Sequence, residues 1–183
     1  MSTILLIRHA EKPDRTMRGV RPNGTPDPES LTVRGWERAG ALAQLLGAEG
    51  GLRAPARTYA SAPGKQKLAS KKVGSDSERP LLTISALAAK LRLKPIEKFT
   101  KGEESDLVKA LVQHRGVTLV CWQHEAIPAI ARLILGKEAD QIPDPWPADR
   151  FDVVWRFKRR KRAWTFKQLC QRLLPGDKAQ PIG

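Results

Sequence analysis

The chain has 183 residues, of which 40% are hydrophobic, and this suits a single domain (1–183) with a substantial core. Its formal net charge is +14, and no apolar run approaches the ~20 residues that a membrane-spanning helix needs. Two cysteines, Cys121 and Cys170, are too few for a disulfide framework, and no Cys/His cluster indicates a metal site. We therefore expect a cytoplasmic protein that needs no metal or other cofactor.

The first expected element is a buried strand over residues 3–7. Its consecutive apolar residues, bounded by charge, are typical of a strand in a parallel sheet. The run stops at Arg8 and His9. Because ligands of open α/β sheets bind outside the carboxyl ends of the strands, this pair predicts an anion site with a nucleophile or a base. The alternative is an arginine-histidine pair that happens to lie in a loop.

Residues 11–30 are rich in proline, glycine and charge, which predicts a loop over the end of the first strand. A helix follows, capped by Ser30 or Thr32, with apolar residues at helical spacing. The run 58–61 indicates a second strand. Residues 62–76 consist largely of glycine, lysine and serine with few apolar anchors, and they predict a mobile loop.

The second half of the chain continues the alternation of helices and strands. A helix begins near Ser77, and another is expected between residues 102 and 115. The apolar run 117–122 predicts another buried strand like the one over residues 3–7, and it also leads into a histidine, His124. A helix over 126–135 follows.

The last part of the chain predicts a strand pair. Alternating large apolar residues indicate two half-buried strands: Phe151, Val153, Trp155 and Phe157 in one, Trp164 and Phe166 in the other. The basic run 158–162 between them is then a hairpin tip. Strands that alternate with helices predict an α/β sandwich with a mostly parallel sheet.

Nine positive charges fall in two short segments that we expect to be loops: Lys65, Lys67, Lys71 and Lys72 in one, and 158–162 in the other. Such segments attract polyanions, but solvated loops that keep the protein soluble are the simpler interpretation. No aromatic residues alternate with the lysines and no nucleic-acid motif accompanies them. We expect neither a nucleic-acid nor a membrane partner.

Four short motifs occur in a specific order. They are Arg-His-Ala-Glu at 8–11, Leu-Thr-x-x-Gly at 31–35, Ser-x-Arg-x-x-x-Thr at 77–83, and a later strand that ends in His124. In this order and context the chain resembles the histidine phosphatase superfamily, also called phosphoglycerate-mutase-like, from residue 3 to about 136. The resemblance implies a three-layer α/β/α sandwich with a mostly parallel central sheet.

The resemblance also assigns roles to individual residues. It implies that His9 is the nucleophile that becomes phosphorylated, and that Arg8, Arg79 and His124 bind the phosphoryl group. Phosphoryl transfer depends on positioning and on neutralising charge on three equatorial oxygens, to which guanidinium groups offer forked donors. His9 must be neutral, with one nitrogen free to attack and the other N–H held by an acceptor.

The chain departs from the family pattern in three places. Ala10 replaces the usual glycine after the histidine, which we expect to do little harm. Arg15 occupies the position of a polar residue that is often asparagine, and it is either an extra phosphate contact or a solvated loop residue. A lysine-rich segment separates Ser61 from Arg79, so the choice of Arg79 rests on Thr83 four residues later.

The general acid that protonates the leaving oxygen is the remaining role. Glu125 directly follows His124, as an aspartate does in the acid phosphatase branch of the family. In the mutase-like branch the acid comes from the segment that holds Glu103 and Glu104. We prefer Glu125; its alternative role is to stabilise the following helix through the helix dipole.

The resemblance predicts a phosphatase that hydrolyses phosphomonoesters through a phosphohistidine intermediate. Its partner is a small phosphorylated substrate or a phosphoprotein. A mutase-type phosphotransferase is the first alternative, which we rank lower because the sequence has no long substrate-enclosing segment. The second is a phosphate-binding regulatory module of low activity, suggested by the departures from the family pattern.

Overall fold

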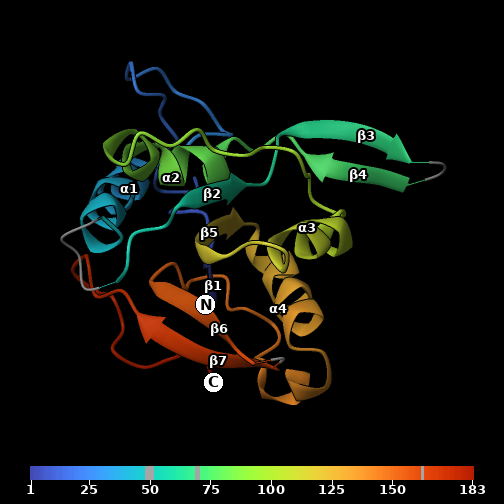
Figure 1. Cartoon of the computed structure of the whole chain (residues 1–183). Helices are drawn as coiled ribbons and strands as arrows, with labels where there is room; N and C mark the ends of the chain where they lie inside the picture. Colours follow the sequence, from blue (N-terminus) through green and yellow to red (C-terminus); the bar gives the residue numbers. More distant parts are fainter. Residues whose placement is uncertain (48–51, 69–70, 162) are drawn as a thin grey trace.

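The computed structural model describes residues 1–47, 52–68, 71–161 and 163–183, with the backbone alone for 65–68 and 71–74. The strands are β1 Ser2–Arg8, β2 Arg57–Ala60, β3 Gly64–Leu68, β4 Lys71–Ser75, β5 Gly116–Trp122, β6 Val153–Arg160 and β7 Ala163–Cys170 (Figure 1). The helices are α1 Val33–Leu45, α2 Arg79–Lys90, α3 Glu104–Leu111 and α4 Ile127–Leu135, with short 3₁₀ helices η1 His124–Ala126 and η2 Gly136–Gln141. Within the described ranges, none of the helices has the length and hydropathy to cross a membrane.

β1 lies in the middle of a five-stranded sheet with the order β2-β5-β1-β6-β7. β5 pairs in parallel with β1 and β2, whereas β6 runs antiparallel to both β1 and β7. The expected mostly parallel sheet is therefore only partly correct, since two pairings are parallel and two are antiparallel. The physical reason for the β6–β7 pairing is its tight connection, because parallel neighbours need a crossover of about a dozen residues or more.

Helices cover both faces of this sheet, as the three-layer prediction requires (Figure 1). Alternate residues of β1 serve the two cores. Leu5 and Ile7 join the core beneath α1 and α2, and Ile4 and Leu6 join the core beneath α3 and α4. A strand that is buried on both faces needs no polar alternation, and this explains the unbroken apolar run at the N-terminus.

The loop after β1 leads back to the carboxyl end of that strand. Residues 11–30, all of which the structure describes, form no helix or strand, as predicted. Thr32, rather than Ser30, caps α1, because its Oγ1 accepts a hydrogen bond from N of Gly35 at 3.1 Å. N of Thr32 also donates to O of Glu11 at 3.0 Å. The helix therefore begins beside the carboxyl end of β1.

Residues 62–76, predicted as a mobile loop, contain the β3–β4 hairpin instead; residues 69–70 lie outside the described part. The pairing runs from Gly64 opposite Ser75 to Leu68 opposite Lys71. Lysine and glycine are weak strand formers, so the residue types gave no signal for strands. Two segments that are adjacent in the chain can still pair through their backbone groups with few strand-forming residues. The hairpin leaves from the carboxyl end of β2 and leads to the N-terminus of α2 (Figure 1).

The predicted strand pair near the C-terminus is present as β6 and β7. Phe151 is an exception, because β6 begins only at Val153 and Phe151 precedes the strand. The basic tip lies at the opposite end of the sheet from His9, since Lys158 pairs with Thr3 at the start of β1. Residue 162 of the basic run lies outside the described part.

Candidate active site

The carboxyl end of β1 places Arg8 and His9 beside the end of β5. The two strands are parallel and in register, with Arg8 opposite Trp122. N of His9 donates to O of Trp122 at 3.1 Å. The chain that leaves β5 through Gln123 and His124 therefore passes next to His9, at the sheet edge where the sequence predicts both histidines.

His9 is buried in the tautomer that a nucleophile needs. Its Nδ1 lies 2.8 Å from O of Ala10, so Nδ1–H donates to that carbonyl and Nε2 carries the free electron pair. Burial, together with the nearby Arg8, Arg79 and His124, lowers the pKa of His9 to about 3. The imidazole is therefore neutral near pH 7, and these three side chains are close enough to act on it.

Arg8 is held by backbone carbonyls that come from far along the chain. Its Nη1 donates to O of Pro147, Ala148 and Arg150 at 3.3, 2.9 and 3.2 Å. The guanidinium lies 3.8 Å from the centroid of the Phe151 ring, in cation–π contact. Burial lowers the pKa of Arg8 to about 10, which leaves it charged at pH 7. Nε and Nη2 are buried and have no hydrogen-bond partner among the described residues.

Arg79 begins α2, and Thr83 in the next turn ties this helix to the end of β1. Oγ1 of Thr83 accepts from N of Ala10 at 2.8 Å and donates to O of Arg79 at 2.7 Å. Nη1 of Arg79 donates to O of Pro28, whereas its buried Nε has no partner in the described structure. Burial lowers the pKa of Arg79. Two arginines near His9 thus have N–H groups that are free to bind an anion.

His124 and Glu125 follow β5 and form a pair. Nδ1 of His124 lies 3.0 Å from one carboxylate oxygen of Glu125, and the other oxygen contacts the ammonium group of Lys101. Interaction with His124, and also with Lys101, holds the pKa of Glu125 well below its ordinary range despite partial burial. Glu125 is therefore ionised at neutral pH in the free protein, whereas a general acid needs a raised pKa.

The two alternative acids have other partners. Oε2 of Glu103 accepts from N of Thr100 at 2.9 Å, just before α3. Oε1 of Glu104 accepts from N of Gly102 at 2.9 Å and from Nε1 of Trp122 at 3.0 Å. Both carboxylates thus stabilise the start of α3. Of the three candidate acids, Glu125 is the one in contact with His124.

Arg15 is the candidate that the structure does not bring to this cluster. It is exposed in the loop after β1 and makes no hydrogen bond or ion pair with any described residue. This position favours the solvated loop residue over the extra phosphate contact. Nor do the described ranges contain three or more His, Cys, Asp or Glu side chains grouped to hold a metal ion.

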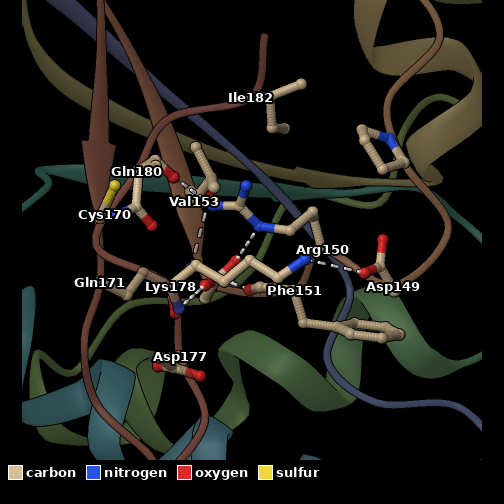
Figure 2. Close-up of polar contacts among 12 residues, drawn as sticks. Asp149, Arg150, Phe151, Val153, Cys170, Gln171, Asp177, Lys178, Gln180 and Ile182 are labelled. Atoms are coloured by element: carbon tan, nitrogen blue, oxygen red, sulfur yellow. Dashed lines mark hydrogen bonds and ion pairs between the residues drawn. The ribbon is translucent and has the colours of Figure 1, made fainter.

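The loop before β6, whose carbonyl groups bind Arg8, forms a wall beside that guanidinium. The C-terminal segment holds this loop, as Figure 2 shows for Asp149, Arg150, Lys178 and Gln180. Nε of Arg150 donates to Asp152 and Nη2 of Arg150 donates to O of Gln180, both at 2.7 Å. Asp152 also accepts from N of Lys178 at 2.6 Å. The carbonyl groups that bind Arg8 are therefore held in place by a segment that follows both β6 and β7 in the chain.

A second network links the loop after His9 to the same C-terminal segment. The buried guanidinium of Arg38 lies 2.8 Å from Glu11 and 2.7 Å from Asp177. Its Nη1 donates to Oε1 of Gln171 at 3.1 Å. Between these segments lies a cavity of about 510 Å³, lined by residues that include Lys12 and Phe151. This volume is in the range of small-molecule sites.

The sequence analysis missed the wall and Lys101. The Asp-Pro-Trp-Pro run at 144–147 carries no local signal that would place it beside Arg8. Phe151 matched the alternation of β6, which hid its contact with the guanidinium. Lys101 is one partly exposed lysine among many, and only the fold brings it to Glu125.

The sequence matches no protein-family model and no curated protein, whereas its fold matches solved structures. A phosphoserine phosphatase from Entamoeba histolytica, in complex with 3-phosphoglyceric acid, has a TM-score of 0.59 and 17% identity, over 95% of this chain and 100% of the other. The protein histidine phosphatase SixA complexed with tungstate has a TM-score of 0.57 and 15% identity, over 92% and 97%. YhfR from Bacillus stearothermophilus has a TM-score of 0.52 and 17% identity, over 90% and 95%. These neighbours are members of the histidine phosphatase superfamily, and the fold that the resemblance implied is confirmed.

Proposed function

We propose that the protein is a phosphatase that hydrolyses phosphomonoesters through a phosphohistidine on Nε2 of His9. The observation that carries the proposal is the state of this side chain. Nδ1–H donates to O of Ala10, burial keeps the ring neutral, and the electron pair of Nε2 is free. The fold, which is that of solved phosphatases, supports the same conclusion.

The two arginines supply the electrostatic part of the reaction. Nε and Nη2 of Arg8 and Nε of Arg79 bind phosphoryl oxygens, since these buried donors have no partner in the described structure. Their charges neutralise the equatorial oxygens as Nε2 of His9 attacks phosphorus and the bond to the leaving oxygen breaks. Phe151 and the loop before β6 keep Arg8 in place during this step.

Glu125 protonates the leaving oxygen, but only when substrate is bound. The phosphoryl group brings negative charge next to Glu125, and a like charge raises the pKa of a carboxyl group. The same anion competes for His124, whose contact lowers the pKa of Glu125 in the free protein. Water then attacks the phosphorus of the phosphohistidine while Glu125 takes a proton from it, and the bond between phosphorus and Nε2 of His9 breaks to release inorganic phosphate.

The substrate is a small phosphorylated molecule or a phosphoprotein, and the cavity beside Phe151 receives part of it. The cavity lining contains both signs of charge, with Lys12, Asp14 and Asp149 among its residues. This favours a polar leaving group over an apolar one. We assign the activity to the cytoplasm, because Cys121 and Cys170 are free thiols.

The test is turnover of an aryl phosphate by wild type and by His9→Gln, with acid quenching to trap the phosphoenzyme. Wild type should release inorganic phosphate and carry an acid-labile phosphate during turnover, and His9→Gln should do neither. His114→Gln is the matched control, because His114 hydrogen-bonds Tyr59 rather than this cluster. Full activity of His9→Gln would contradict the proposal, and binding without phosphate release would favour the regulatory module.

A further inference from the structure

A second pocket lies at the opposite end of the sheet from His9. Its volume is about 260 Å³, and it opens beside the starts of β1 and β5, the distal half of β6 and residues 52–53. Three cationic side chains line it, Arg53, Arg156 and Lys158. Its lining contains no acidic side chain among the described residues. We call these three residues and the space between them the basic pocket.

The cations of the basic pocket are placed by the pleat of β6. Its odd positions, such as Trp155 and Phe157, are buried in the core beneath α3 and α4. Its even positions therefore carry Arg156 and Lys158 onto the other face, about 7 Å apart along the strand. α1 and α2 cover this face over the neighbouring strands and over Val154, the even position nearest the start of β6, where Leu5 joins the same core.

Among the described residues, the charges of this face have no counter-ion. Arg53, Arg156 and Lys158 make no hydrogen bond or ion pair through their side chains with any described residue. Arg156 also lies directly opposite Lys167 of β7. Like charges opposite each other on paired strands destabilise a sheet, and Arg156 and Lys158 are half-buried, which weakens their hydration. A bound anion would relieve both costs.

The shape and lining of the pocket favour a compact anion over a nucleic acid. Leu5, Leu52 and Val117 form an apolar floor, and no aromatic side chain lines it in the described structure. Single-stranded nucleic acids need aromatic platforms for their bases. The aromatic residues of this hairpin, Trp164 and Phe166, pack against the core on the opposite face.

We propose that the basic pocket binds a compact, multiply charged phosphate anion of the diphosphate class. The site is independent of the cluster around His9, because the two lie at opposite ends of β1. A diphosphate group can contact Arg156 and Lys158 together, while Arg53 approaches from the segment after α1. Binding there couples the β6–β7 hairpin to the rest of the sheet.

The test uses methylenediphosphonate, whose P–C–P bridge resists hydrolysis, and amide NMR spectra that report each end of the sheet separately. At low salt we expect saturable shifts at Val117, Lys158 and Thr165, distinct from any shift at Ala10. In the double variant Arg156→Gln/Lys158→Gln these shifts should require at least about tenfold more ligand, as loss of two charged hydrogen bonds implies.

The matched control is Lys94→Gln/Lys137→Gln, which removes the same charge from exposed positions elsewhere. It should bind as wild type does. Equal weakening in both double variants, or shifts confined to Ala10 and its neighbours, would overturn the proposal. Protection of Lys158 against acetylation by the same ligand, compared with Lys94, tests the wild-type protein directly, and its absence would count equally against the site.

Discussion

Burial of His9 makes the fold sensitive to acid, and most of this sensitivity should disappear in His9→Gln. Desolvation, reinforced by the charge of Arg8, lowers the pKa of His9 to about 3, whereas a histidine in the unfolded chain titrates near pH 6.5. Between these two values the unfolded chain binds a proton that the folded chain does not. The folded state therefore loses stability as the pH falls from about 6.5 toward 3.

The loss of stability follows from the difference between the pH and the pKa of the histidine in the unfolded chain. A pH of 4.5 is about two units below the pKa of a histidine in the unfolded chain, and this difference corresponds to about 3 kcal/mol of lost stability. At pH 7.5 the contribution is close to zero, because neither state binds the proton. Carboxyl groups that titrate over the same range do so in both proteins, so they largely cancel when the variant is compared with wild type.

The measurement is urea unfolding at pH 7.5 and 4.5, followed by tryptophan fluorescence. Wild type should lose about 3 kcal/mol more than His9→Gln between the two values. Equal losses would mean that His9 is protonated in the folded state at pH 4.5. That result would refute the burial of His9 without a negative charge beside it. It would also refute the neutral nucleophile that the proposed mechanism requires.

Three further changes test other parts of the structure. Thr83→Val leaves the buried N–H of Ala10 without an acceptor, so unfolding should require about 1–3 kcal/mol less and kcat/KM should fall, whereas Thr83→Ser should retain both. Arg38→Met strands two carboxylates in their network and should cost about 3–5 kcal/mol; a loss below ~1 kcal/mol would mean that the network contributes little. Neutralising the four lysines of the β3–β4 hairpin together should lower kcat/KM for a multiply charged substrate at low salt, an effect that fades near 1 M salt, where the Debye length is about 3 Å. Neutralising 158–161 should leave kcat/KM unaltered. The variant of the β3–β4 hairpin removes the charges of Lys65, Lys67, Lys71 and Lys72, and unchanged kinetics of this variant at low salt would refute electrostatic steering.

The sequence was most informative where burial follows from one element alone. The apolar runs of β1 and β5 indicated strands that are buried on both faces, and their parallel pairing brings His9 and His124 to one edge. The hydroxyl group of Thr83, on which the choice of Arg79 rested, binds both O of Arg79 and the backbone after β1, so the motif and the fold place Arg79 at the same end of the sheet as His9.

Contacts between distant segments could not be predicted in this way. The carbonyl groups that hold Arg8 come from residues about 140 positions away, and backbone carbonyls carry no residue signature. The ionised state of Glu125 depends on its neighbour His124 and also on Lys101, which only the fold brings near. The β3–β4 hairpin was missed because its ladder uses backbone groups rather than an apolar pattern.

The central position of β1 has a consequence for synthesis on the ribosome. The strand is made before both of its neighbours in the sheet, which are residues 116–122 and 153–160. At about 5–20 residues per second, translation reaches the Arg8-binding loop roughly 7–28 s after β1 is made. Both edges of this strand, whose residues 4–7 are all apolar, are unpaired until residues 116–122 have been made, and the edge that meets β6 stays open for longer; an open edge is the condition for pairing with other chains. The strand that delivers Arg8 and His9 is therefore also the part of the nascent chain with the greatest need of a chaperone.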